Sequence, residues 1–213
     1  MRYVAPTSTV REWFHQGENR RAYEMLGAHP VLQDGIEMWH FAVWAPNARL
    51  VSLVGEFCQW DRLAHPMVKQ FDGTWEIRLP ASTFDVASNP QKYNYPDAAE
   101  KLLMYKYAIQ GEDRTWHEKA DPYGFRMQLR PNTASMLCDL SGYSWQDQAW
   151  MDKRAQWDPY HSPMNIYEMH LGSWRRASDG ELPSYRELAQ TLPAYAAKLG
   201  YPCGIVAGNG ASL

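Results

Sequence analysis

The stretch "MWHFAVWAPNARLVSLVGEF", residues 38–57, decides the fold. In its first half Trp39, Phe41 and Val43 alternate with their neighbours, and the run ends at Pro46. The second half alternates in the same way and ends near Gly55. An alternation with a period of two is typical of a strand that buries one face. The stretch therefore predicts two consecutive strands joined by a turn.

Similar runs follow along the chain, and they extend the sheet prediction. They are "GTWEIRLP" at 73–80, "LMYKYAIQG" at 103–111 and "SMLCDL" at 135–140. In the second of these, Tyr105 and Tyr107 point opposite to Lys106. Roughly 100 residues of short strands with turn residues between them favour an immunoglobulin-like β-sandwich. Trp39 and Trp75 fall on the inward positions and are predicted to lie in its core.

The segments around the predicted sandwich have a different character. "TVREWFHQGENRRAYEMLGAHP", residues 9–30, predicts a short helix with Thr9 as N-cap and Glu12 as its capping-box partner. Residues 141–164 are polar, contain two prolines, and predict a connector that is helical around 146–154. The stretch between 81 and 104 is long for a hairpin loop, and "PDAAEKLLM" within it has helical propensity.

A single βα unit, the building block of parallel α/β folds, follows the connector. "NIYEMHL" begins at Asn165 and predicts a strand, and "SYRELAQTLPAYAAKLGY" predicts a helix capped by Ser184, ended by Gly200 and kinked or split at Pro193. The tail 202–213 holds one short apolar run at 205–207, which is not expected to supply a second full strand.

The composition limits the class of partner. The 213 residues carry a net charge of -3 with a pI near 6.2, which disfavours electrostatic binding to nucleic acid or to an anionic membrane. No apolar stretch reaches the length of a membrane span or of a signal peptide core, so we expect a cytoplasmic protein. The three cysteines are far apart in sequence, which predicts free thiols and no metal site. We expect no cofactor.

Eight motifs in sequence order resemble the glycogen (1,4-α-glucan) branching enzyme family. They are "YEMLGAHP", "FAVWAPNARLVSLVGEFCQWD", "HPM", "GTWEIRLP", "YKYAI", "KADPYGF", "RPNTASML" and "NIYEMHLGSWRR". The resemblance spans roughly residues 23–201 and implies an N-terminal carbohydrate-binding module of family 48. It also implies that a catalytic (β/α)₈ barrel of the α-amylase superfamily begins after the module. The motif "HLGSWRR" favours branching enzymes over debranching enzymes and trehalose-releasing hydrolases, which are the weaker alternatives.

The resemblance divides the chain into five parts. These are an N-terminal helix and lead-in at 1–34, the carbohydrate-binding sandwich at 35–140, the connector at 141–164, the first βα unit of an incomplete barrel at 165–201, and a divergent tail at 202–213.

The resemblance leads us to expect no catalytic residue within this chain. A retaining glycosyl transferase needs two carboxyl groups about 5 Å apart at the ends of several barrel strands. In the resembled family these groups lie on later strands than the first. The polar residues near the first strand, Glu168, His170 and Asp179, are interpreted as strand-end residues, and Trp174, Arg175 and Arg176 as a loop at the barrel's top. We therefore expect a truncated form that cannot branch glucan by itself.

The resemblance implies a binding surface for α-glucans such as glycogen and maltooligosaccharides. Flat aromatic rings stack on the apolar faces of sugars, and polar groups bind their hydroxyls. The family's binding residues correspond to Trp60, Lys106 and Trp116, of which Trp116 matches the family pattern less well. Three hypotheses remain: part of a branching enzyme, a stand-alone glycan-binding module, and a product of a truncated reading frame without function.

Overall fold

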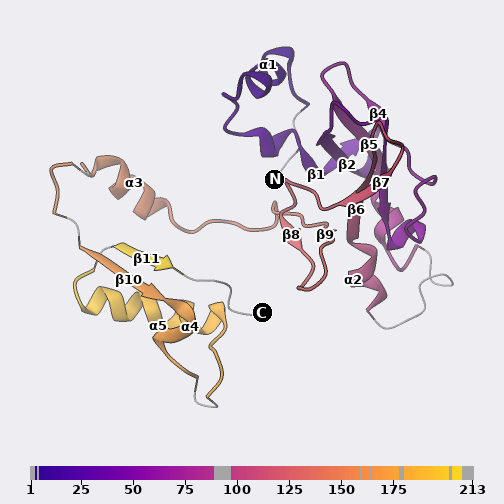
Figure 1. Cartoon of the computed structure of the whole chain (residues 1–213). Coiled ribbons are helices and arrows are strands. Elements are labelled where there is room, and N and C mark those ends of the chain that lie inside the picture. The colour runs from indigo at the N-terminus through magenta and orange to yellow at the C-terminus, as the bar shows by residue number, and fades with distance from the viewer. Residues whose placement is uncertain are drawn as a thin grey trace. The chain divides into compact units, whose positions relative to one another are not determined.

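The computed structural model describes residues 3, 5–88, 97–158, 160–163, 165–177, 180–201 and 203–207. The chain forms two compact units, Met1–Ser144 and Trp145–Leu213 (Figure 1). Each unit is described separately below. Among the described residues, every helix is too short or too polar to cross a membrane.

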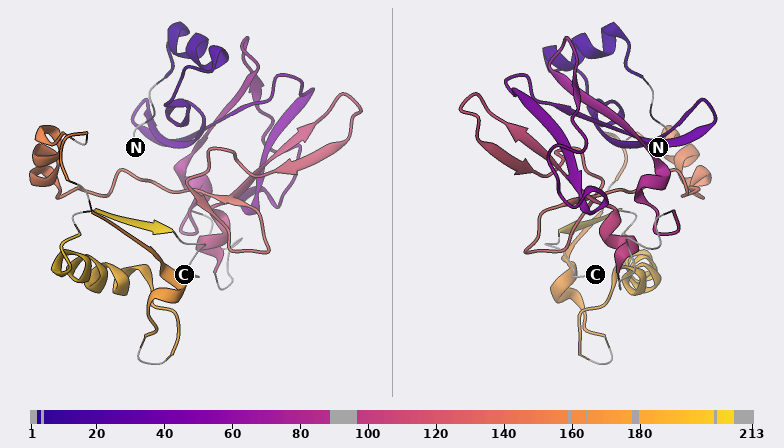
Figure 2. Two further views of the ribbon diagram at one scale, coloured as in Figure 1. Left: turned by 60° about the vertical axis from the view of Figure 1, so that its left-hand side comes forward. Right: turned by 90° about the vertical axis from the view of Figure 1, so that its right-hand side faces the viewer.

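The first sheet of the first unit is antiparallel and contains four strands. Its strands are β1 (Gly27–Gln33), β2 (Ile36–Trp44), β5 (Thr74–Pro80) and β4 (Val68–Lys69), in the spatial order β1-β2-β5-β4. Figure 2 shows the strands as arrows in two further views. Strand β1 lies before the predicted strands and was not predicted. Its sequence "GAHPVLQ" contains Gly27 and Pro30 and lacks the alternation used for the prediction. As an edge strand, β1 tolerates a proline.

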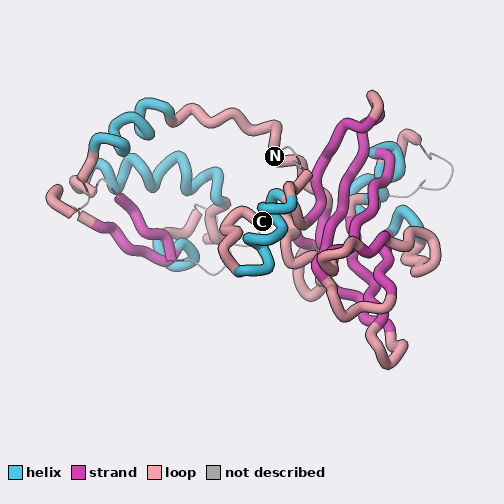
Figure 3. The backbone as a smooth tube through the Cα atoms, turned by 90° about the horizontal axis from the view of Figure 1, so that it is seen from above, coloured by secondary structure: helices cyan, strands magenta, loops and turns pink. Residues whose placement is uncertain are grey.

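The second sheet has five strands. Its path is β3 (Leu50–Gly55), β6 (Met104–Gln110), β9 (Ser135–Met136) and β8 (Arg126–Met127), and β7 (Trp116–Lys119) also pairs with β6. Figure 3 shows the strands in magenta. All its pairings are antiparallel. The predicted strand at 135–140 is shorter in the structure and covers two residues.

The inward faces of the two sheets share one hydrophobic core. Phe41 of the first sheet packs edge-on against Tyr105 of the second, with ring centroids 5.2 Å apart. Trp75 is buried, and its indole N–H donates to the carbonyl of Ala45 at 2.9 Å. Trp39 is partly buried against the same core. The sandwich and the core position of Trp75 are confirmed, whereas Trp39 lies at the edge of the core and stays partly exposed.

Helix α1 (Ser8–Gln16) is attached to the first sheet by an ionic cluster. The Arg11 guanidinium donates to Asp72 at 2.7 Å and to Glu76 at 2.9 Å. The N-cap is Thr7, whose hydroxyl accepts from the Val10 N–H, so the prediction of Thr9 was wrong. The helix begins two residues earlier than its first apolar residue suggested. Gly17 ends the helix in a left-handed conformation.

The long connection between β5 and β6 is partly helical. A 3₁₀ turn, η3 (Ala81–Phe84), buries Phe84, and helix α2 (Ala98–Leu102) buries Leu102. The prediction of helical structure in "PDAAEKLLM" is confirmed for α2, and residues 89–96 lie outside the described part of the chain.

The second unit contains a parallel pair of strands with helices. Its elements are α3 (Gln148–Gln156), β10 (Ile166–His170), α4 (Leu171–Trp174), α5 (Tyr185–Lys198) and β11 (Cys203–Ala207). The predicted helix in the connector and the βα unit are both present. Ser184 and Glu187 form the capping box of α5, and Pro193 lies within one continuous helix instead of splitting it.

The tail prediction was wrong in one respect, because residues 203–207 form a strand. Strand β11 pairs in parallel with β10, from Ile166 opposite Cys203 to His170 opposite Ala207. Two β-branched residues, Ile205 and Val206, make this short run a strand former despite its glycine. Helix α5 lies between the parallel strands β10 and β11 in sequence, so the three elements form a βαβ unit.

Candidate functional site

Lys106 lies on the outer face of the second sheet, at the centre of strand β6. Its neighbours Tyr105 and Tyr107 are buried on the inner face. Strand β7 continues the outer face, because Glu118 lies opposite Ala108 and Trp116 lies opposite Gln110. Directly opposite residues of an antiparallel pair point to the same side. The alternation predicted for 103–111 therefore places Lys106 on the same surface as two residues of β7.

Trp60 reaches this surface from the turn after strand β3. The short helix η2 (Glu56–Cys58) ends at Gln59, and Gln59 and Trp60 both have left-handed backbones, with φ of 55° and 60°. The Trp60 N–H donates to the Gly55 carbonyl at 2.9 Å, and its indole N–H donates to the Glu56 carboxylate at 3.2 Å. These contacts fix both the backbone and the ring of Trp60.

Trp60 and Lys106 line the same hollow, which has a volume of about 420 Å³. The loop between β8 and β9 forms another wall of it, and it is closed by hydrogen bonds from Gln128 N to Ala134 O at 2.8 Å and from Asn132 N to Leu129 O at 3.2 Å. The full lining is Trp60, Lys106, Glu118, Gln128, Pro131, Asn132, Thr133 and Ala134.

The third predicted residue, Trp116, lies on the same outer face but does not line the hollow. Its ring lies beneath Arg62, whose guanidinium carbon is 6.0 Å from the ring centroid. Arg62 also forms an ion pair with Glu118 at 2.9 Å. The structure therefore brings Trp60 and Lys106 together in one hollow, and it leaves Trp116 outside that hollow, in contact with Arg62.

The polar groups of the hollow suit a neutral, hydroxyl-rich ligand. Within the described part of the chain, the Lys106 ammonium has no hydrogen-bond or ion-pair partner, so its three donors are available. Asn132, Thr133 and Gln128 add side chains that both donate and accept. No group of three or more His, Cys, Asp or Glu side chains lies together as metal ligands would, among the residues described.

Sequence reasoning missed the contribution of the loop between β8 and β9. Its residues form part of the motif "RPNTASML", which supported the family resemblance without any assigned role. Pro131, Asn132 and Thr133 are turn formers, so the segment indicates a loop. Only the pairing of β8 and β9 with β6 places this loop beside Lys106.

A buried polar network lies directly behind the site. The hydroxyls of Tyr105 and Tyr107 donate to the Asp121 carboxylate at 2.7 and 3.2 Å, and the Tyr123 N–H donates to its other oxygen at 2.8 Å. Burial raises the pKa of Asp121 above its usual range, and burial also raises the pKa values of both tyrosines. The two tyrosines that flank Lys106 are therefore anchored to one carboxylate.

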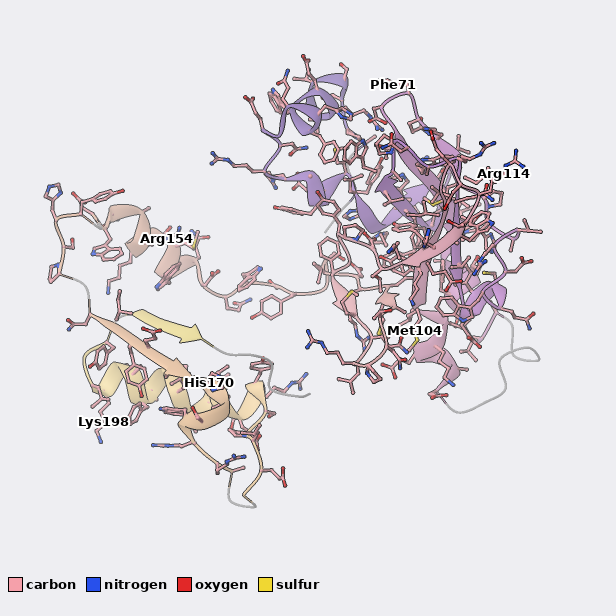
Figure 4. All side chains as sticks on the ribbon, in the orientation of Figure 1. Phe71, Met104, Arg114, Arg154, His170 and Lys198 are labelled. Atoms are coloured by element: carbon pink, nitrogen blue, oxygen red, sulfur yellow. The ribbon has the colours of Figure 1, made fainter. Side chains whose placement is uncertain are left out.

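The polar residues near β10 gather no pair of carboxylates among the described residues. Glu168 and His170 lie on the strand itself, and Figure 4 shows His170 at its C-terminal end. The Trp174 indole N–H donates to the Tyr167 hydroxyl at 3.0 Å, and Arg175 lies 4.8 Å from the Trp174 ring centroid. The residues 171–174 form a short helix where a loop was expected, and Asp179 lies outside the described residues.

Comparisons with known proteins agree with this architecture. Residues 25–124 match the family model of carbohydrate-binding module 48 (isoamylase N-terminal domain). The 1,4-alpha-glucan branching enzyme GlgB of Synechococcus sp. (strain JA-3-3Ab) is 40% identical over 209 residues, which cover 90% of this chain and 25% of that protein. GlgB of Rubrobacter xylanophilus is 46% identical over 188 residues, which cover 88% of this chain and 24% of that protein. The chain thus spans about a quarter of the length of these relatives.

A solved structure shows the same fold at lower sequence identity. The Group B Streptococcus pullulanase SAP aligns with a TM-score of 0.51 at 17% identity, covering 86% of this chain and 25% of the pullulanase. The same pullulanase in complex with maltotetraose gives a TM-score of 0.50.

Proposed function

We propose that the chain is an N-terminal portion of a 1,4-α-glucan branching enzyme and that the outer-face hollow of its family 48 module binds α-glucan. The observation that carries the proposal is the meeting of Trp60 and Lys106 in one hollow with an amide- and hydroxyl-bearing loop. The ring of Trp60 stacks on the apolar face of a glucose unit. Lys106 and the loop residues bind the hydroxyls at its rim.

The donor and acceptor arrangement supports a sugar over an anionic ligand. Lys106 supplies one positive charge, and Glu118 supplies one negative charge on the same lining. The indole N–H of Trp60 is already bonded to Glu56, so this residue offers its ring face instead of a donor. An aromatic face beside several neutral polar side chains matches the alternating apolar and hydroxyl surfaces of a glucan.

The proposed role of the whole protein is the formation of α-1,6 branches in glycogen by transfer of glucan chains. The module would hold the glucan while carboxylates elsewhere act on it. Among the described residues no carboxylate pair is assigned to catalysis, and our proposal is that the chain by itself binds glucan without transferring it. A stand-alone binding module is the alternative, and both readings require the same binding site.

Calorimetric titration with maltoheptaose tests the binding proposal, with cellohexaose as the β-linked control. Truncation of a central aromatic residue costs at least ~2 kcal/mol at many interfaces, so Trp60→Ala should weaken binding by about thirtyfold. Lys106→Ala removes hydrogen bonds worth about 1 kcal/mol and should weaken it about fivefold.

The matched control is Trp145→Ala, which removes a tryptophan that is 74% exposed and belongs to the second unit. It should leave the affinity unchanged. Circular dichroism confirms that each variant folds. Unchanged affinity in both site variants, or the absence of maltoheptaose binding at millimolar concentration, would refute the proposed site. Incubation with amylose, followed by counting of branch points, tests whether the chain alone transfers glucan.

A further inference from the structure

Arg62 lies against the ring of Trp116. The guanidinium carbon lies 6.0 Å from the ring centroid, within the range of a cation–π contact. The same guanidinium donates to the Glu118 carboxylate at 2.9 Å. The side chains of Arg62 and Glu118 are 44% and 31% exposed, so this ion pair faces solvent. The arginine therefore contacts the ring of Trp116 while its own side chain stays partly exposed to solvent.

The position of Trp116 makes it a second contact for a long ligand. Lys106 and Gln110, the partner of Trp116, are four residues apart on β6, or about 13 Å along the strand. Glu118 lies between these two positions, on the hollow's lining. A ligand that reaches from Trp60 to Trp116 must extend over Glu118 and must displace Arg62.

We infer that Arg62 is a displaceable cover on a second α-glucan subsite formed by Trp116. This inference rests on the proposed function of the hollow. A short maltooligosaccharide fills the hollow alone and does not meet Arg62. A longer α-1,4 chain continues onto the Trp116 ring after Arg62 moves away from it. Arg62 and Glu118 together thus reduce the difference in binding affinity between long and short glucan chains.

The contacts that hold the cover are weak enough for a ligand to break. An exposed ion pair and an exposed cation–π contact each contribute little. Their combined loss corresponds to a change of about threefold to tenfold in affinity. The cover is ionic, while the ligand is neutral. Salt therefore weakens the contacts that hold Arg62 over Trp116 and leaves the stacking of the sugar largely unchanged.

Titration of the full chain with maltotriose and maltoheptaose tests the inference. Arg62→Ala should bind maltoheptaose about threefold to tenfold more tightly, with maltotriose binding unchanged. Trp116→Ala in the Arg62→Ala background should abolish this gain. Glu118→Gln, which breaks the ion pair and keeps the arginine, should give a smaller gain. The matched control is Arg186→Ala, an exposed arginine of helix α5 in the second unit, and it should change neither affinity.

A second measurement separates the cover from a general charge effect. Raising the salt concentration from 0.02 to about 0.5 M should strengthen maltoheptaose binding in the unmodified chain and leave it constant in Arg62→Ala. Weaker maltoheptaose binding in Arg62→Ala would show that the arginine binds the sugar, and it would overturn the inference. An equal gain for both sugars would also overturn it. Loss of all binding to the unmodified chain would instead refute the proposed function.

Discussion

The hydroxyl of Tyr105 lies 2.7 Å from the Asp121 carboxylate, to which it donates a hydrogen bond inside the sandwich. Tyr105 is 1% exposed and Asp121 is 4% exposed, so water cannot replace a lost partner easily. Loss of a hydrogen bond to a buried charged group costs about 1–3 kcal/mol. The network therefore makes a sizeable contribution to the stability of the first unit.

The first prediction concerns this hydrogen bond. Tyr105→Phe should lower the free energy of unfolding of the first unit by about 2 kcal/mol, because Asp121 loses one donor while the ring is kept. Urea unfolding, followed by tryptophan fluorescence, measures the change. The matched control is Tyr143→Phe, which alters a hydroxyl on a residue that is 68% exposed and should have little effect. Equal stability of Tyr105→Phe and the unmodified chain would contradict the prediction.

The second prediction concerns the attachment of helix α1. Arg11→Ala should destabilise the first unit by about 2 kcal/mol, because Asp72 loses its guanidinium partner and its side chain is only 2% exposed. The amide hydrogens of α1 should also exchange faster with solvent. Hydrogen exchange with mass spectrometry measures this. Arg21→Ala, which breaks the exposed Arg21–Glu24 ion pair, serves as control and should leave α1 exchange unchanged.

The third prediction concerns the loss of folding stability at acidic pH. Burial lowers the pKa of His40 and also that of His29. The folded chain keeps both imidazoles neutral below about pH 6.5, where the unfolded chain protonates them. The unfolded state then binds more protons, so stability should fall as the pH drops through this range. The pKa of Glu76 is lowered by its hydrogen bond with His40, and its contribution is lost only at lower pH.

Urea unfolding at pH 7.5, 6.5 and 5.5 measures this dependence. His40→Gln should reduce the pH slope between 7.5 and 5.5, although it also lowers the overall stability. Trp145→Ala, the control used for the binding site, changes no group that titrates in this range and should leave the slope unchanged. An unchanged slope in His40→Gln would argue that His29 alone carries the effect, which His29→Gln then tests.

The fourth prediction concerns the close packing at Gly55. A Cβ at this position would lie 2.3 Å from the Met104 carbonyl oxygen and 2.4 Å from a ring carbon of Phe57. Gly55→Ala should therefore destabilise the first unit by about 2 kcal/mol through overpacking. It should also weaken glucan binding, since the Gly55 carbonyl holds the Trp60 backbone. Gly142→Ala, where a Cβ meets nothing within 4 Å, is the control for both measurements.

Most of the fold was predicted from the alternation of inward and outward residues along the strands. Residues such as Phe41, Tyr105 and Tyr107 mark the inward face because a half-buried strand repeats every two residues. Strand β1 was missed because Gly27 and Pro30 interrupt that pattern, and its pairing with β2 is a tertiary effect. Strand β11 was missed because five residues give too short a pattern, while the parallel partner β10 supplies its hydrogen bonds.

The site could be predicted only in part. Trp60 and Lys106 followed from the family resemblance, and the geometry places them in one hollow. The contacts of Arg62 with Trp116 and Glu118 could not be predicted, because Arg62 and Glu118 are 56 residues apart in sequence and only the fold brings them together. The exposed Phe71, labelled in Figure 4 and 88% exposed, lies on the hairpin between β4 and β5 and had no sequence signal of a role.

The consecutive left-handed backbones at Gln59 and Trp60 affect how a ligand would be received. Residues other than glycine adopt this conformation at a cost of about 1 kcal/mol each, which the rest of the fold must outweigh. In return the indole is already oriented before any sugar arrives, so little side-chain freedom remains to be lost on association. If the hollow binds glucan as proposed, rigidity at this turn converts folding stability into affinity for a neutral, hydroxyl-rich polymer.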